Sequence, residues 1–246
     1  MIPKEIRNRR GERLDFTVHP GEAGVSTLVV IGHGVTGNKD RPLLMTLAEA
    51  LAARGITALR LSFSGNGNSE GRFEESSVSK EVEDLGAVLD ALPAWRIGYV
   101  GHSMGAAVGV LRAAMDPRLS FLVSLAGMAH TAAFAQREFG NVTPGAGLMW
   151  DKPECPLSQE FIDDMQRVGS VVDAASRVQV PWLFVHGSTD DVVPVQDSRD
   201  LFATAKEPKR MLELDGADHV FSDVHAPEMA RSVVAWIKEQ HLQVGT

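Results

Sequence analysis

The sequence predicts an α/β fold, with a mostly parallel central sheet covered by helices on both faces. Three observations lead to this prediction. Apolar runs of strand length alternate with stretches of helical spacing along the 246 residues. The run 27–31 is mostly apolar and rich in β-branched residues, which is typical of a strand buried on both faces. The run 97–100 leads through a glycine-bounded turn into a helix of small residues.

Six apolar runs predict the strands of the sheet. They cover 27–31, 56–63, 97–100, 119–125, 181–185 and 210–214. Between them, apolar residues three and four positions apart predict amphipathic helices. The expected helices cover about 43–52, 82–92, 104–115, 195–205 and 228–240. Because strands and helices alternate, neighbouring strands are expected to run parallel.

Two further predictions concern the first sixty residues. Loose alternation of apolar and polar residues predicts a hairpin with strands 5–8 and 14–19. Before the helix that starts near residue 43, Asp40 is expected to act as the N-cap. Pro42 suits the first turn of the same helix, because that position needs no backbone N–H.

One segment interrupts the alternation. A crossover between parallel strands needs about a dozen residues, but 127–179 is far longer and contains several glycines and prolines. We expect a single domain over 1–246 with a small inserted cap, or lid, at about 126–156. Short helices are then expected near 159–167 and 173–177.

Composition limits the classes of function. The single cysteine, Cys155, excludes an intramolecular disulfide, and no Cys/His spacing typical of a zinc site is present. A net charge of −8 argues against nucleic acid or an anionic membrane as a partner. No apolar run is long enough to span a bilayer, and residues 1–10 lack the apolar stretch of a signal peptide. We therefore expect a cytoplasmic enzyme.

The pattern G-x-S-x-G occurs twice. In the copy 101–105, a buried strand precedes Ser103 and a small-residue helix follows it, as a nucleophile at a sharp strand-to-helix turn requires. In the copy 67–71, Ser69 follows a Gly/Asn-rich loop and precedes a stretch without an apolar stripe. Ser103 is therefore the predicted nucleophile, and Ser69 is predicted to be a turn residue.

A serine hydroxyl needs a base to remove its proton and an acid to orient that base. After the strand 181–185, Asp190 lies where its side chain can turn back over the sheet edge, whereas the adjacent Asp191 is interpreted as a solvated turn residue. His219 follows the last strand through a short loop and is the predicted base. The alternatives are His225, expected at the start of the closing helix, and His241, near the chain end.

Two backbone amides are expected to bind the oxyanion of a tetrahedral intermediate. One belongs to Met104, the residue after the nucleophile, and the other to Val35 in the loop after the first buried strand. Gly34 allows this loop to approach the substrate closely. The other candidates for substrate contact are Met128, His130, Trp150 and Val193, for which a plain core role is the alternative.

The remaining histidines have structural interpretations. His33 and His186 each end a strand just before a glycine and are expected to support the structure. His102 occupies the variable position of the turn and is expected to pack beneath it.

Five motifs occur in the order that a known family shows. They are 33–38 (HGVTGN), 63–71 (FSGNGNSEG), 101–105 (GHSMG), 186–194 (HGSTDDVVP) and 216–219 (GADH). Together they resemble the serine-esterase branch of the α/β-hydrolases, especially bacterial cinnamoyl/feruloyl esterases and related carboxylesterases. The resemblance covers about residues 26–240 and implies the α/β-hydrolase fold.

The resemblance also implies site residues. It implies that Ser103, Asp190 and His219 form the catalytic triad. It also implies that the backbone amides of Val35 and Met104 bind the oxyanion. Where the family often has an aromatic residue in the oxyanion loop, this chain has Val35.

These observations predict a serine hydrolase that cleaves carboxylic esters, with a small or aromatic acyl group, through an acyl-enzyme. A small-molecule ester is the expected partner, and neither a metal nor an organic cofactor is expected. Two alternatives stay open: the same machinery acting on a thioester, amide or peptide, and a hydrolase-like binding protein without turnover. A dehalogenase is disfavoured because serine, not aspartate, occupies position 103.

Overall fold

A computed structural model describes the backbone of residues 1–242 and the side chains of residues 1–240. These residues form a seven-stranded sheet in the order β3-β5-β4-β6-β7-β8-β9. Its strands are β3 (Phe16–His19), β4 (Thr27–Gly32), β5 (Thr57–Leu61), β6 (Arg96–His102), β7 (Leu119–Leu125), β8 (Trp182–Gly187) and β9 (Lys209–Leu214). Only the pairing of β3 with β5 is antiparallel within this sheet. The predicted mostly parallel sheet is therefore confirmed.

The predicted N-terminal hairpin is confirmed where Ile6 pairs with Leu14, but it is wrong for residues 16–19. β1 (Ile6–Arg7) pairs with β2 (Arg13–Leu14) as a separate two-stranded ribbon. β3 instead pairs with β5 and forms the edge of the main sheet. The alternation of polar and apolar residues identified extended segments, but it carried no information about their partners.

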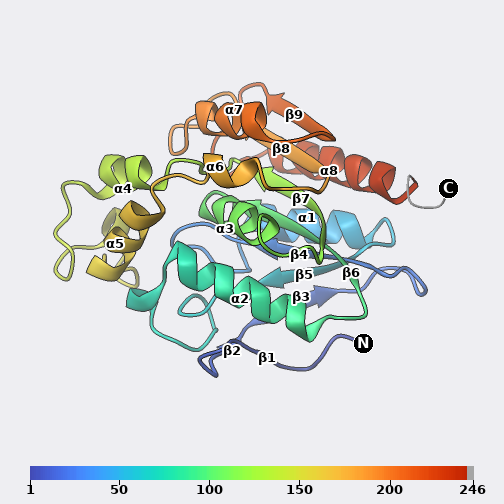
Figure 1. The fold of residues 1–246 in the computed structure, drawn as a ribbon, viewed down its shortest axis with the longest axis horizontal. Helices are drawn as coiled ribbons and strands as arrows, with labels where there is room; N and C mark the ends of the chain where they lie inside the picture. The colour runs from blue at the N-terminus through green and yellow to red at the C-terminus, as the bar shows by residue number, and fades with distance from the viewer. Residues whose placement is uncertain (243–246) are drawn as a thin grey trace.

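Helices cover both faces of the sheet (Figure 1). The α-helices are α1 (Pro42–Ala52), α2 (Val78–Ala91), α3 (Met104–Ala113), α4 (Thr131–Phe139), α5 (Gln159–Val168), α6 (Val172–Ala175), α7 (Val195–Thr204) and α8 (His225–Leu242). Two 3₁₀ helices, η1 (Phe73–Glu75) and η2 (Met149–Asp151), complete the described elements. α5 and α6 lie where the sequence predicted short helices.

The alternation of side chains along β4 separates two hydrophobic cores. Leu28 and Val30 belong to the core that includes apolar residues of α2 and α3. Val29 and Ile31 belong to the core that includes apolar residues of α1 and α8. All four side chains are fully buried. A strand with apolar residues on both faces therefore explains why the sheet is the middle of three layers.

The start of α1 differs from the prediction. Pro42 occupies the first turn as expected, but Arg41 is the N-cap and its side chain makes no capping hydrogen bond. Asp40 instead forms ion pairs with Lys39 and Arg60, both at 2.9 Å. These two cations hold the Asp40 carboxylate away from the helix terminus, so it does not cap α1.

Aromatic side chains organise the predicted cap segment, 126–156, which folds as α4 followed by η2. The ring of Phe139 lies 6.1 Å from Phe134, 4.9 Å from Trp150 and 6.0 Å from Phe161 on α5, measured between centroids. α4 and α5 lie together at one end of the molecule (Figure 1). The aromatic cluster thus joins the segment to α5.

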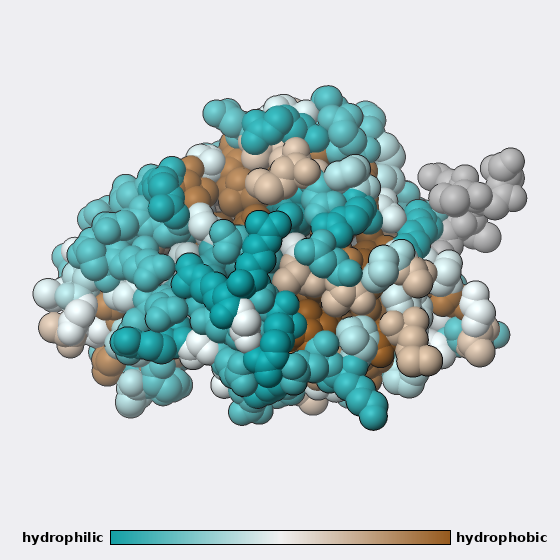
Figure 2. Space-filling model, turned by 60° about the horizontal axis from the view of Figure 1, so that its bottom comes forward, coloured by the Kyte–Doolittle hydropathy of each residue, from teal (hydrophilic) through white to brown (hydrophobic). Residues whose placement is uncertain are grey.

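The face shown in Figure 2 is mostly hydrophilic, with smaller hydrophobic areas among the polar residues. Within residues 1–242, no helix is both long enough and apolar enough to cross a membrane.

Candidate active site

Ser103 lies on the sharp turn between β6 and α3. Its backbone has φ 55° and ψ −120°, a conformation that few residues other than glycine adopt. The Ser103 N–H donates to Leu125 O at 2.9 Å, and Ser103 O accepts from Met128 N at 3.2 Å. These bonds to the chain at and beyond the end of β7 hold the turn in place, and the Ser103 side chain lines a cavity.

The two glycines of this turn are needed for steric reasons. A Cβ at Gly101 would lie 2.2 Å from the carbonyl oxygen of Gly105. A Cβ at Gly105 would lie 2.5 Å from the carbonyl oxygen of His33. Both distances are far shorter than a normal contact, so only glycine permits the close approach of helix and strand that the sequence pattern predicted.

The side chain of Asp190 is fully buried, and hydrogen-bond donors contact both of its oxygens. Its Oδ1 accepts from the N–H groups of Val192 and Val193, at 2.9 and 2.8 Å. Its Oδ2 lies 2.8 Å from His219 Nδ1 and 3.1 Å from His186 Nε2. Burial alone would raise the pKa of Asp190, but the hydrogen bonds from His186 and His219 lower it well below its usual range. The carboxylate is therefore ionised.

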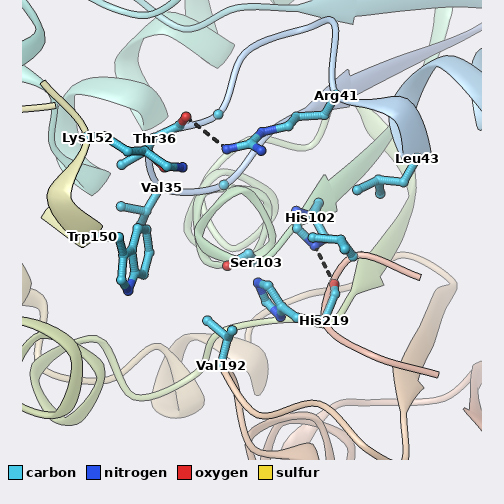
Figure 3. A pocket seen from close by; sticks show the side chains of 13 residues that line it. Val35, Thr36, Arg41, Leu43, His102, Ser103, Trp150, Lys152, Val192 and His219 are labelled. Carbon is cyan, nitrogen blue, oxygen red and sulfur yellow. Dashed lines mark hydrogen bonds between the residues drawn. The ribbon is translucent and has the colours of Figure 1, made fainter. Parts of the chain in front are cut away.

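An ionised carboxylate only accepts hydrogen bonds, so it fixes the tautomer of His219. Nδ1 of His219 carries the proton that is donated to Asp190, and Nε2 keeps its lone pair. Figure 3 shows the His219 ring beside Ser103. This is the arrangement that a base next to a serine hydroxyl requires.

His102 supports the loop that carries His219. Its Nε2 donates to the carbonyl oxygen of His219 at 2.9 Å, and the two rings lie 4.8 Å apart. Burial, the neighbouring His219 and, to a smaller extent, the charge of Arg41 lower the pKa of His102 to about 3. His102 is therefore neutral and anchors the loop after β9.

His33 orients the loop that follows β4. Its Nε2 accepts from Phe63 N at 3.0 Å, so Nδ1 carries the proton and donates to Gly34 O at 2.9 Å. Gly37 N also donates to Gly34 O, at 3.0 Å. In a trans peptide the N–H points opposite to the C=O. The N–H of Val35 therefore points away from His33.

Gly34 brings this peptide close to the nucleophile. A Cβ at Gly34 would lie 2.6 Å from Ser103 Cβ and 3.1 Å from Ser103 Oγ. The N–H of Val35 and that of Met104, in the first turn of α3, donate to no group within the described residues. Two free backbone donors thus belong to the peptides nearest the serine side chain, where an oxyanion would need them.

A cavity of about 280 Å³ lies above Ser103 (Figure 3). Among the predicted contact residues, Gly34, Val35 and Trp150 line it together with Ser103 and His219. The other lining residues are Thr36, Gly37, Arg41, Leu43, His102, Lys152, Val192 and Val220. This volume is at the lower end of the range for small-molecule sites.

Three predicted contact residues lie outside this lining. Met128 is fully buried in the core, and its N–H supports Ser103. Val193 is also fully buried in the core, and its neighbour Val192 lines the cavity instead. His130 occupies the N-cap position of α4 without a capping hydrogen bond from its side chain, and its Nε2 lies 2.9 Å from Asp200 Oδ2.

Ser69 is part of a structural loop, as predicted. Its hydroxyl donates to Ser62 O and accepts from Asp15 N, both at 2.7 Å. These bonds join the loop after β5 to the segment before β3.

The competing acid and base candidates are also separate from Ser103: Asp191 is exposed and His225 begins α8. The side chain of His241 lies outside the described residues.

A known protein family matches the part of the chain that contains Ser103. The family described as "Serine aminopeptidase, S33" (Hydrolase_4) matches residues 24–152, just over half of the chain. The chain belongs to this family. The matched region contains Ser103 and the loop with Gly34, and it ends before Asp190 and His219. The resemblance to α/β-hydrolase serine esterases is thereby confirmed.

Relatives of this Hydrolase_4 chain are known from several bacteria. An uncharacterised protein of Mycobacterium tuberculosis (strain ATCC 25618 / H37Rv) is 29% identical over 219 residues, which are 87% of this chain and 70% of that protein. Est1E from Butyrivibrio proteoclasticus, solved with ferulic acid bound, has a TM-score of 0.84 at 23% identity and covers 98% of this chain and 100% of its own. An esterase domain from Rhodothermus marinus has a TM-score of 0.75 at 23% identity, over 96% of each chain. These two structures confirm the fold.

Several residues that line this cavity were not predicted from the sequence. Arg41 and Lys152 line the cavity, yet the sequence pointed only to Asp40 and Trp150 beside them. The available signal was a cation soon after the loop 33–38 and another in the inserted segment. Thr36 has a φ of 56°, which is uncommon for a β-branched residue and marks a tightly held loop.

Proposed function

We propose that this Hydrolase_4 member is a serine hydrolase of carboxylic esters that works through an acyl-enzyme. One observation carries the proposal: His219 Nδ1 lies 2.8 Å from the buried, ionised Asp190, in a cavity that the nucleophile candidate Ser103 also lines. This arrangement leaves His219 Nε2 free to act as a base. A small-molecule ester is the proposed partner.

In the acylation step, His219 Nε2 removes the hydroxyl proton of Ser103 as Oγ attacks the ester carbonyl carbon. The carbonyl π bond opens, and the resulting oxyanion is held by the N–H groups of Val35 and Met104. When the C–O bond to the alcohol breaks, the protonated His219 gives its proton to the leaving oxygen. The product of this half-reaction is an ester between the acyl group and Ser103.

Water completes the cycle. His219 Nε2 takes a proton from a water molecule, which attacks the acyl carbonyl, and the same two amides hold the second oxyanion. Collapse of this intermediate breaks the bond to Ser103 Oγ, which regains its proton from His219. Asp190 stays ionised throughout and stabilises the protonated imidazole.

The charge of the cavity supports an ester rather than an aminopeptidase substrate. An aminopeptidase must bind a free ammonium group close to the scissile bond, which calls for a carboxylate. The described lining contains the cations Arg41 and Lys152 and no Asp or Glu. An ammonium group would therefore be repelled from this site.

Two serines in identical motifs give a matched test. We expect Ser103→Ala to abolish hydrolysis of p-nitrophenyl butyrate, while Ser69→Ala retains turnover per folded molecule. Thermal unfolding of both variants checks that each is folded. Full activity in Ser103→Ala would contradict the proposal. Comparing phenyl butyrate with phenyl thiobutyrate distinguishes an esterase from a thioesterase.

A further inference from the structure

Two cations occupy the cavity of a protein that is acidic overall. The chain has a net charge of −8, with 32 Asp and Glu against 24 Lys and Arg. Among the described lining residues, however, the charged side chains are Arg41 and Lys152, and no carboxylate is present. The remaining walls are largely apolar, with Leu43, Val192 and Val220. The cavity therefore has the opposite charge from the rest of the chain.

Both cations are held by one residue of the oxyanion loop. Arg41 Nη2 donates to Thr36 O at 3.0 Å, and Lys152 Nζ donates to Thr36 Oγ1 at 3.0 Å. Arg41 comes from the start of α1 and Lys152 from the segment after η2. Figure 3 shows both side chains next to Thr36, on one side of the cavity that contains Ser103. Thr36 thus fixes two charges next to Val35.

Neither cation is neutralised by a carboxylate within the part of the chain that the structure describes. Two cations close by behave differently: Lys39 and Arg60 both pair with Asp40, at 2.9 Å. Arg41 and Lys152 make their polar contacts with uncharged oxygens of Thr36.

Donors also remain available on both groups. A guanidinium has five N–H donors and an ammonium has three, and the bonds to Thr36 use one on each side chain. Lys152 Nζ also lies 5.7 Å from the centre of the Trp150 ring, which forms an apolar wall beside it. An anion in this position would accept charge-assisted hydrogen bonds next to apolar surface, where such bonds are strong.

We propose that this cavity selects esters that carry a carboxylate, which Arg41 and Lys152 bind while Ser103 attacks the ester carbonyl. This inference rests on the function proposed above and adds the substrate class. The carboxylate belongs either to the acyl part or to the alcohol part of the ester, and matched substrates distinguish the two.

For the acyl part, monomethyl adipate is compared with methyl hexanoate. Their acyl chains have equal length and differ by a terminal carboxylate in place of a methyl group. Methanol release gives kcat/KM for each, and the ratio of the two values is the readout. We expect the wild-type ratio to exceed one and to fall about tenfold in Lys152→Met and in Arg41→Met. Lys206→Met, an exposed lysine outside the cavity, is the control and leaves the ratio unchanged.

For the alcohol part, 4-acetoxybenzoate is compared with phenyl acetate through the release of the phenol. The substrate pair whose ratio falls in Lys152→Met and Arg41→Met identifies whether the acyl part or the alcohol part of the substrate carries the carboxylate. Lys152→Arg and Arg41→Lys keep the charge and are expected to retain most of the preference, which a merely structural role would not predict.

The two proposals fail in different ways. Ser103-dependent hydrolysis of the neutral esters, with ratios that neither Lys152→Met nor Arg41→Met changes in either arm, would overturn the carboxylate selection alone. A folded wild-type protein that hydrolyses none of the four esters would overturn the esterase proposal and this inference with it.

Discussion

His186 Nε2 lies 3.1 Å from Asp190 Oδ2, the same oxygen that accepts the Nδ1 proton of His219. His186 is fully buried, and its Nδ1 accepts from the Ser198 hydroxyl at 2.7 Å, so Nε2 carries the proton. That proton is shared between Asp190 and Val193 O, which is 2.9 Å away. Two histidines thus share the Asp190 carboxylate. His219 lines the cavity, whereas His186 is buried and holds the carboxylate in place.

The role of His186 as a positioning residue can be tested with two variants. His186→Leu removes the donor, and we expect kcat to fall about tenfold with little change in KM, because the carboxylate loses one of its supports. His186→Gln keeps an N–H near the position of Nε2 and is expected to restore part of kcat. Steady-state kinetics on p-nitrophenyl butyrate measures both. Equal loss in the two variants would speak against a positioning role.

Asp190→Asn tests the acid itself. An amide at this position no longer stabilises the protonated imidazole or fixes its tautomer, so we expect kcat to fall about 10³–10⁴-fold. Asp191→Asn is the matched control, because Asp191 is exposed and adjacent in sequence. Single-turnover kinetics would measure the difference. A loss that is as large in Asp191→Asn would contradict the assignment.

His33 should act on the oxyanion site through the Gly34 peptide. His33→Leu removes one of the two donors to Gly34 O and leaves only the N–H of Gly37. The Val35 N–H is then held less firmly, and we expect kcat to fall about 10²-fold. His33→Asn retains an N–H near the position of Nδ1 and is expected to recover much of this loss. Because burial lowers the pKa of His33 to about 4, its contribution stays constant across the neutral range. A steep change of the His33→Asn to wild-type ratio between about pH 6 and 8 would oppose this account.

Glu81 on α2 is predicted to limit stability at neutral and alkaline pH. It is fully buried with an unpaired Oε2, and burial, followed by the charges of Asp84 and Asp164, raises its pKa well above the ordinary 4.5. Above the unfolded-state pKa the unfolded chain releases this proton while the folded chain retains it. Stability therefore falls as pH rises from that value towards the folded-state pKa.

Glu81→Gln removes this pH dependence. We expect its Tm to exceed that of the wild type by roughly 2–4 °C near pH 8, with the difference vanishing below about pH 4. Glu83→Gln, at an exposed position of the same helix, is the control and should show no such trend. Differential scanning calorimetry across this range measures the effect. A Tm difference that is independent of pH would show that ionisation of Glu81 is not its cause.

Local sequence patterns predicted the parts of the fold that local physics determines. The strand 119–125 and the helix near 195–205 were found almost to the residue, because buried strands and amphipathic helices leave clear periodicities. The pairing of β3 with the sheet edge and the contacts of Asp40 were missed. The pairing of β3 with β5 and the contact of Asp40 with Arg60 join segments that are distant in sequence, and the local pattern of one sequence does not reveal such contacts.

The same distinction between local and distant contacts applies to the candidate site. Ser103, Asp190 and His219 were predicted because each follows a strand at the same edge of a parallel sheet. Val193 was predicted to contact the substrate, but Val192 lines the cavity and Val193 belongs to the core. The sequence carries no signal that distinguishes these two adjacent valines. Arg41 and Lys152 are more than a hundred positions apart, and only the fold brings both to Thr36.

The central claim is that Ser103 is the nucleophile, and labelling with a fluorophosphonate tests it most directly. The reagent phosphonylates a serine that is activated by its base, with loss of fluoride. Intact-protein mass spectrometry and peptide mapping of the wild type are expected to show one adduct per chain, on the peptide that contains Ser103, and none in Ser103→Ala. An adduct on Ser69, or a folded wild-type protein that remains unlabelled, would contradict the account.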